Sequence, residues 1–191
     1  MIERVKQGDF ALVDLEKIAR SGAVQAIPVL EKQFAATEDA TVKGKMAFAL
    51  GRLGDKNESY WNYLAEQASL AIGSDMPDPN DYDAQGKLIP GPSPEFTAWA
   101  KAHKLTEQAA ETLYGDHFRD LMFLEEAEDP RAIPCLRQAL LSSNFALEII
   151  AADGLVDLQD KASIPLIVDA CQRAPAEVAQ GMARDLLKFD D

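Results

Sequence analysis

The chain has 191 residues, of which 47% are hydrophobic and 27% charged, a balance typical of one folded domain and unlike that of a disordered chain. Its formal net charge is −13, from 32 acidic and 19 basic residues, so the backbone of a nucleic acid would be repelled. No run approaches the ~18 apolar residues of a membrane helix, and the opening segment, MIERVKQGDF, lacks the apolar stretch of a secretion signal, so we expect a cytoplasmic protein that binds neither nucleic acid nor membrane.

The first predicted element is a helix within Asp9–Arg20, which reads DFALVDLEKIAR and has helical periodicity. We expect helices over residues 1–21 to cap the first full unit. That unit covers residues 22–55 and contains the pair Ile27-Pro28. Proline is tolerated in the first turn of a helix, so a helix can begin at this pair. A second apolar segment follows it, with Val42, Ala47 and Leu50 at increments of five and then three residues.

The middle of the chain is a degenerate unit over residues 56–128. Tyr60–Ile72 is its predicted first helix. A proline-rich loop over residues 73–94 then interrupts the unit, since proline and glycine at this density preclude a helix interior. Leu105, Ala110 and Leu113 repeat the five-then-three steps and predict the second helix. Asp116–Glu128 is expected to form an additional helical stretch before the regular units resume.

The loop holds the only compositionally unusual features of the chain. Asp81 and Asp83 begin a pattern similar to a calcium-binding loop, but the twelfth position, where a bidentate Glu is needed, is Pro92. A solvated turn over residues 84–87 is therefore the better interpretation. Aromatic residues near the loop (Tyr82, Phe96 and Trp99) either anchor it to the body of the protein or form a ligand-contact patch.

Two further units follow, over residues 129–159 and 160–191. Asp129–Leu136 reads DPRAIPCL and Asp160–Ile167 reads DKASIPLI, at an offset of 31 residues. A period near thirty is the sequence signature of stacked helical repeats, in which each unit buries its apolar face against its neighbours. The second apolar segments repeat the five-then-three steps of the first unit, with these members: Leu147, Ala152 and Leu155, then Val178, Ala183 and Leu186.

These segments resemble HEAT-like repeats, particularly the short bacterial type also found in phycobilin lyases. The matching pieces are AIPVL with VKGKMAFALGRLGD, DPRAIPCL with LEIIAADGLVDLQD, and ASIPLI with VAQGMARDLL. The resemblance implies an all-α fold, a right-handed α-solenoid of stacked antiparallel helix hairpins, interrupted in the middle by the long loop. The chain departs from the family at one position. In the family an arginine often follows the first apolar anchor of the second helix, whereas this chain has Lys43, Glu148 and Ala179 there.

In such an array the second helices line the concave face, which is the usual binding surface. The positions six and ten residues after each anchor should project from the core: Phe48, Arg52, Glu111, Asp153, Asp157, Arg184 and Lys188. Phe48 is the most informative of these, because an exposed aromatic on a groove indicates binding. The alternative is that its ring packs beneath the neighbouring unit.

No catalytic, cofactor-binding or metal-ligating motif is recognisable. His103 and His117 have no metal-ligand spacing, and Cys135 and Cys171 are out of register with each other, so neither a metal site nor a disulfide is expected. The leading hypothesis is a non-enzymatic scaffold that binds a protein or peptide in the concave groove. We expect a monomer, because the acidic residues at 188–191 resemble a solvated cap. The alternative is a lyase-like or chaperone-like protein that holds a small apolar ligand.

Overall fold

The computed structural model describes residues 2–7, 10–142 and 144–190, and within them the chain is almost entirely helical, which confirms the all-α class. The α-helices are α1 (Ile2–Lys6), α2 (Leu12–Ser21), α3 (Ile27–Ala36), α4 (Ala40–Arg52), α5 (Glu58–Ile72), α6 (Pro94–Ala102), α7 (Glu107–Glu126), α8 (Ile133–Ala139), α9 (Phe145–Asp157), α10 (Ile164–Arg173) and α11 (Ala176–Leu186). Two short strands, β1 (Asp81–Tyr82) and β2 (Leu88–Ile89), pair antiparallel between α5 and α6. A 3-10 turn, Leu187–Asp190, follows α11.

Each of the three Ile-Pro pairs begins a helix. Ile27, Ile133 and Ile164 are the first residues of α3, α8 and α10, and the proline comes second. The proline lacks an N–H, but the first turn of a helix has no intrahelical acceptor for that group in any case. A short 3-10 turn precedes each pair: Val24–Ala26, Pro130–Ala132 and Lys161–Ser163. The helix starts read from the repeat are therefore confirmed.

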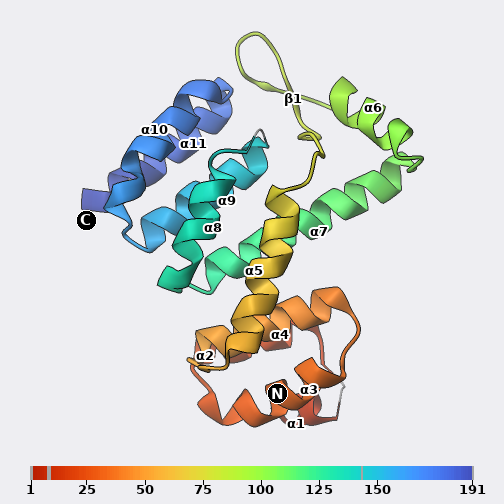
Figure 1. The fold of residues 1–191 in the computed structure, drawn as a ribbon, viewed down its shortest axis with the longest axis vertical. Helices are drawn as coiled ribbons and strands as arrows, with labels where there is room; N and C mark the ends of the chain where they lie inside the picture. Colours follow the sequence, from red (N-terminus) through yellow and green to blue (C-terminus); the bar gives the residue numbers. More distant parts are fainter. Residues whose placement is uncertain (1, 8–9, 143, 191) are drawn as a thin grey trace.

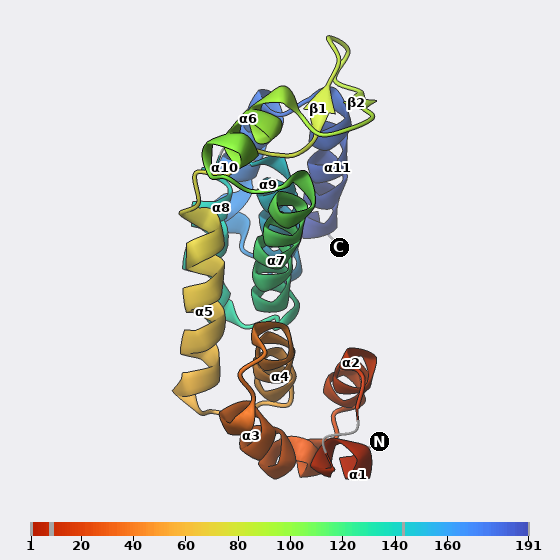
Figure 2. The same cartoon turned by 90° about the vertical axis from the view of Figure 1, so that its right-hand side faces the viewer.

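The helices pack as hairpins whose second members form a continuous row. The hairpins are α3 with α4, α5 with α7, α8 with α9, and α10 with α11. Along the row, α2 contacts α4, α4 contacts α7, α7 contacts α9, and α9 contacts α11. Helices α1 to α4 lie at one end of the long axis, and α10 and α11 lie beyond α8 and α9 toward the other (Figure 1). Figure 2 shows α5 and α7 running side by side through the middle of the molecule.

The core lies between these helices, and the repeated small residues are part of it. Ala47 on α4 and Ala152 on α9 are fully buried, as expected where neighbouring helices approach closely. Ala183 in α11 is exposed, so the prediction of a close approach there is wrong. The reason is its place in the row: in the described part of the chain no further helix packs beyond α11.

The middle unit differs from its prediction. Residues 107–126 form the single helix α7, in which the predicted second helix and the predicted additional stretch are continuous. The first half buries Ala110 but leaves Leu113 36% exposed. Leu121 and Leu124, in the second half, are fully buried. The part of α7 that takes the place of a second helix is therefore its C-terminal half.

The segment between α5 and α6 is held against the body of the protein by specific contacts. Its strands join through the turn predicted at residues 84–87, where the Asp83 carboxylate accepts hydrogen bonds from the backbone N–H groups of Gln85 and Lys87, both 2.9 Å long. The aromatics around it anchor it: the Tyr82 ring lies edge-on to Phe145, and Phe96 is fully buried in a small cluster with Trp99 and other apolar side chains.

Candidate functional site

The surface of the helix row is hollowed where α4, α7 and α9 lie next to one another. The hollow encloses about 320 Å³. Five of its lining residues are acidic, and Arg20 and Arg52 are the basic ones. We call it the acidic hollow and define it by these residues: Arg20, Phe48, Arg52, Met122, Glu125, Glu126, Glu128, Asp153 and Asp157.

One side of the acidic hollow rests on a pair of stacked aromatic rings. Phe48 stacks on Phe123 with ring centroids 6.2 Å apart, and the Lys45 ammonium lies 4.8 Å from each centroid. Lys45 Nζ is also 3.8 Å from a carboxylate oxygen of Glu126. Phe48 is only 2% exposed, so the prediction that its ring projects from the core face is wrong. The alternative, packing beneath the neighbouring unit, is the correct one, because α7 lies against α4 here.

Three carboxylates converge in the acidic hollow. One oxygen from each of Glu125, Asp153 and Asp157 lies within 4.8 Å of the others. Burial raises the pKa of Glu125 to about 7, and the negative charges of Asp153 and Glu126 add to the increase. Burial, followed by the charge of Asp153, also raises the pKa of Asp157. Glu125 and Asp153 are half-buried, whereas Asp157 is exposed, so the cost of removing a carboxylate from water falls mainly on Glu125.

Two basic side chains compensate part of the negative charge. The Lys188 ammonium lies 2.9 Å from Asp153 Oδ1 and 2.8 Å from an oxygen of Asp185, which raises the pKa of Lys188. Arg52 forms an ion pair with Glu128. Within the described residues, the Glu125 and Asp157 side chains form no hydrogen bond and no ion pair (residues 2–7, 10–142 and 144–190). These two carboxylates are the ones left for a ligand.

The structure brings together most of the residues predicted for the concave face. Four of them, Phe48, Arg52, Asp153 and Asp157, line the acidic hollow, and Lys188 reaches it through Asp153. Glu111 is exposed on the first half of α7, whereas the hollow takes its α7 residues from the other end. Arg184 is exposed on α11 and does not line the hollow either.

Sequence reasoning missed the α7 contribution, which comprises Met122, Glu125, Glu126 and the nearby Glu128. A signal was present in the run EEAED at residues 125–129, the densest acidic stretch between two predicted units. The periodicity predicts it as an addition to the degenerate unit, whereas in the structure residues 125 and 126 end the unit's second helix, α7. Arg20 was missed as well, because α2 was assigned only a capping role.

The arrangement is suited to binding a cation. Two unpartnered carboxylates beside a third can accept hydrogen bonds from an ammonium or a guanidinium group, and such charge-assisted bonds are stronger than neutral ones. Lys188 already shows the geometry with a lysine of the chain itself. A calcium ion prefers about six to eight oxygen ligands, and the three carboxylates would supply fewer than that, so an organic cation fits the set better.

No model of a known protein family matches the chain, and no characterised protein matches it significantly. None of the helices in the described residues combines the length and the apolar character that crossing a membrane requires.

Proposed function

We propose that this protein is a non-enzymatic binding module that holds a lysine- or arginine-bearing segment of a partner protein in the acidic hollow. The observation that carries the proposal is the pair of unpartnered carboxylates, Glu125 and Asp157, beside Asp153. A bound ammonium or guanidinium group would compensate their charge, which the surrounding side chains compensate only in part.

The proposed scaffold is a right-handed α-solenoid of the HEAT-like type. The support is the repeated Ile-Pro helix start, together with the succession of contacts from α2 through α4, α7 and α9 to α11. In solenoids the second helices offer an extended binding face. The acidic hollow lies on this row, where the resemblance to HEAT-like repeats leads one to expect a partner.

Charge favours a basic protein segment over a nucleic acid as the partner. The chain carries a formal charge of −13, and the acidic hollow concentrates five carboxylates in one place. A polyanion would have to overcome this field, whereas a basic peptide would be attracted by it. The electrostatic contribution should appear mostly as specificity and a faster association rate, with affinity that falls as salt rises.

A direct test measures the binding of a short fluorescent peptide of alternating lysine and serine at low ionic strength. In the double variant Glu125→Gln and Asp157→Asn we expect binding about tenfold weaker, because the two unpartnered carboxylates are gone. The control is Glu66→Gln with Glu111→Gln, which changes the net charge by the same amount at two exposed positions outside the hollow.

The control pair should weaken binding by less than about threefold, since surface charges at a distance act only through a screened field. Equal losses in the two double variants would mean that the peptide responds to overall charge, and the proposal would be wrong. Addition of Ca²⁺ provides a second check: displacement of the peptide at micromolar Ca²⁺ would assign the three carboxylates to a metal ion instead.

A further inference from the structure

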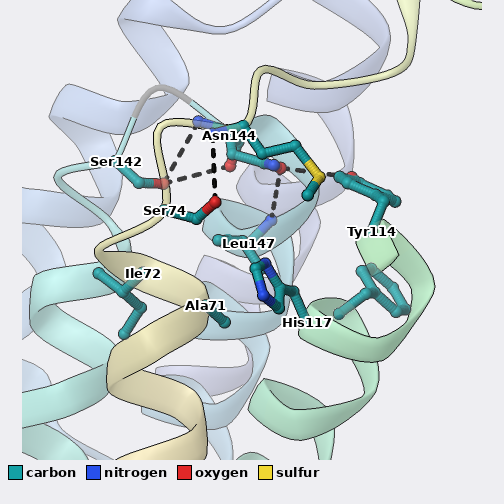
Figure 3. A pocket seen from close by; sticks show the side chains of 10 residues that line it. Ala71, Ile72, Ser74, Tyr114, His117, Ser142, Asn144 and Leu147 are labelled. Atoms are coloured by element: carbon teal, nitrogen blue, oxygen red, sulfur yellow. Dashed lines mark hydrogen bonds between the residues drawn. The ribbon is translucent and has the colours of Figure 1, made fainter. Parts of the chain in front are cut away.

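A second hollow lies about the end of α5, the first half of α7 and the start of α9, away from the residues of the acidic hollow. It encloses about 210 Å³. Figure 3 shows that its wall is mixed: Ala71, Ile72 and Leu147 contribute apolar surface, and several polar side chains point inward. We call it the polar pocket and define it by its lining residues: Ala71, Ile72, Ser74, Met76, Tyr114, His117, Phe118, Ser142, Asn144 and Leu147.

Most polar atoms of the polar pocket are already bonded within the protein. Asn144 Oδ1 accepts hydrogen bonds from the backbone N–H groups of Ala146 and Leu147, at 3.1 and 3.3 Å, and caps α9. It also accepts one from the Tyr114 hydroxyl at 3.3 Å. Ser74 Oγ accepts one from the backbone N–H of Met76. These bonds hold the wall in place and use the oxygen of Asn144 fully.

Other groups on the same wall have no partner. The His117 ring, projecting from α7 (Figure 3), forms no hydrogen bond with any described residue. The Asn144 side-chain amide N–H₂ likewise forms none in the described part of the chain. Partial burial lowers the pKa of His117 despite the adjacent charge of Asp116. Its ring is therefore neutral near pH 7 and offers one donor and one acceptor.

The electrostatics select a neutral ligand. The Asp78 carboxylate is only 8% exposed and accepts a hydrogen bond from the Ala146 N–H at 3.3 Å. Burial raises the pKa of Tyr114, and the charge of Asp78 adds to the increase. This charge disfavours an anion in the polar pocket. The same charge attracts a cation, but Asp78 does not line the pocket and already accepts the hydrogen bond from Ala146, so a cation inside would have no carboxylate to pair with directly. A buried charge without a direct partner is costly.

We propose that the polar pocket binds a small neutral molecule that presents both a hydrogen-bond donor and an acceptor on an apolar body, the chemistry of a primary aromatic amide. The acceptor of the ligand faces the Asn144 side-chain N–H₂, its donor faces the unprotonated nitrogen of the His117 ring, and the apolar body lies against Ile72 and Leu147. The proposal is independent of the acidic hollow, because the two sites share no lining residue.

The test uses four probes of nearly equal size: benzamide, benzoate, benzylammonium and toluene. Binding is followed by NMR through the ring signals of His117 and His103, which are the only two histidines of the chain. Benzamide has about nine non-hydrogen atoms, so its dissociation constant should be on the order of 1 mM. We expect it to shift the His117 signals and leave His103, which stacks on Trp99 outside the polar pocket, unchanged.

The proposal fails if benzoate or benzylammonium binds more tightly than benzamide, because the pocket would then select a charge. It also fails if toluene binds as tightly, because the polar groups would then contribute nothing. The variant His117→Leu, which keeps the apolar wall, should weaken benzamide binding about tenfold, and His103→Leu should not change it. Equal affinity in both variants would overturn the assignment of His117, with thermal unfolding used to confirm that both are folded.

Discussion

The residue most affected by its surroundings in the acidic hollow is Glu125. Its pKa of about 7 lies well above the ordinary value of 4.5, mainly because burial disfavours the ionised form. A carboxyl group with a raised pKa in the folded state binds more protons when folded than when unfolded. The free energy of unfolding should therefore decrease as pH rises from about 4.5 through 7, and the loss is complete above that interval.

Substitution Glu125→Gln should remove this pH dependence. At pH 8 we expect the variant to be more stable than the parent by about 1–2 kcal/mol, an estimate reduced for the solvent screening of a side chain that is partly exposed. At pH 4 the difference should vanish, since the parent is then protonated in both states. Urea unfolding at the two pH values measures it. Glu111→Gln on the same helix is the control, and an equal gain there at pH 8 would contradict the explanation.

At the scale of elements, ion pairs join successive hairpins, and they involve different positions in different units. Arg137 of α8 binds Asp160, just before the next hairpin, with nitrogen–oxygen distances of 2.8 and 2.9 Å. Arg173 of α10 reaches back to Glu148 of α9 at 2.8 Å and donates a second bond to the Leu140 carbonyl. Glu148 and Arg173 therefore join α9 to the hairpin that follows it.

For the ion pair of Arg173 and Glu148, we expect removal of one partner to destabilise the protein more than removal of both. Because Glu148 is fully buried, Arg173→Leu should lower the free energy of unfolding by about 3 kcal/mol, since it leaves a buried carboxylate without its partner. The double variant Glu148→Leu with Arg173→Leu should recover most of the loss. Chemical denaturation gives the values. Arg184→Leu, at an exposed position of α11, should change stability by less than about 0.5 kcal/mol.

The helix starts could be predicted from sequence, but the register of α7 could not. From Leu105, Ala110 and Leu113, a shift of 11 residues gives Asp116, Leu121 and Leu124, with the same five-then-three steps. Eleven residues make three helical turns with an error of about 20°, so Ala110 and Leu113 lie on nearly the same face of α7 as Leu121 and Leu124. Periodicity cannot choose between them. Packing does, because α4 and α9 contact α7 and bury Leu121 and Leu124.

The same shift explains two of the missed residues of the acidic hollow. In the observed register the positions six and ten residues after Asp116 are Met122 and Glu126, and both line the acidic hollow. The prediction placed Glu111 there instead. In α7, too, these positions therefore line the acidic hollow, and the error came from choosing the wrong one of two equivalent registers.

At the scale of the whole molecule, the segment between α5 and α6 ties the middle of the chain to its C-terminal helices. Asp78 accepts a hydrogen bond from the N–H of Ala146 at the start of α9, 68 residues away. The Leu88 N–H donates to the Glu177 carboxylate of α11, 89 residues away, and the Glu177 N–H donates to the Gly86 carbonyl. No local pattern reveals such pairings, so the sequence indicated a loop and left its place in the fold open.

Gly86 is the position where this attachment can be tested. Its φ is +74°, and a Cβ built there would lie 2.3 Å from the backbone nitrogen of Ala176, a distance that requires the strand pair to move away from α11. Gly91, in the same segment, has a φ of +102° and open space around it. Both glycines adopt backbone conformations that side chains disfavour, so only Gly86→Ala adds the steric conflict with α11.

We therefore expect Gly86→Ala to release the strand pair while the helical row stays folded. Hydrogen exchange should become at least tenfold faster at the Leu88 and Glu177 amides, whose hydrogen bonds join the strand pair to α11. Gly91→Ala carries the backbone strain alone and should leave those two amides protected. Unchanged protection in Gly86→Ala would show that the attachment to α11 does not exist in solution. Loss of protection throughout α9 and α11 would show instead that the segment is required for the fold of the C-terminal hairpins.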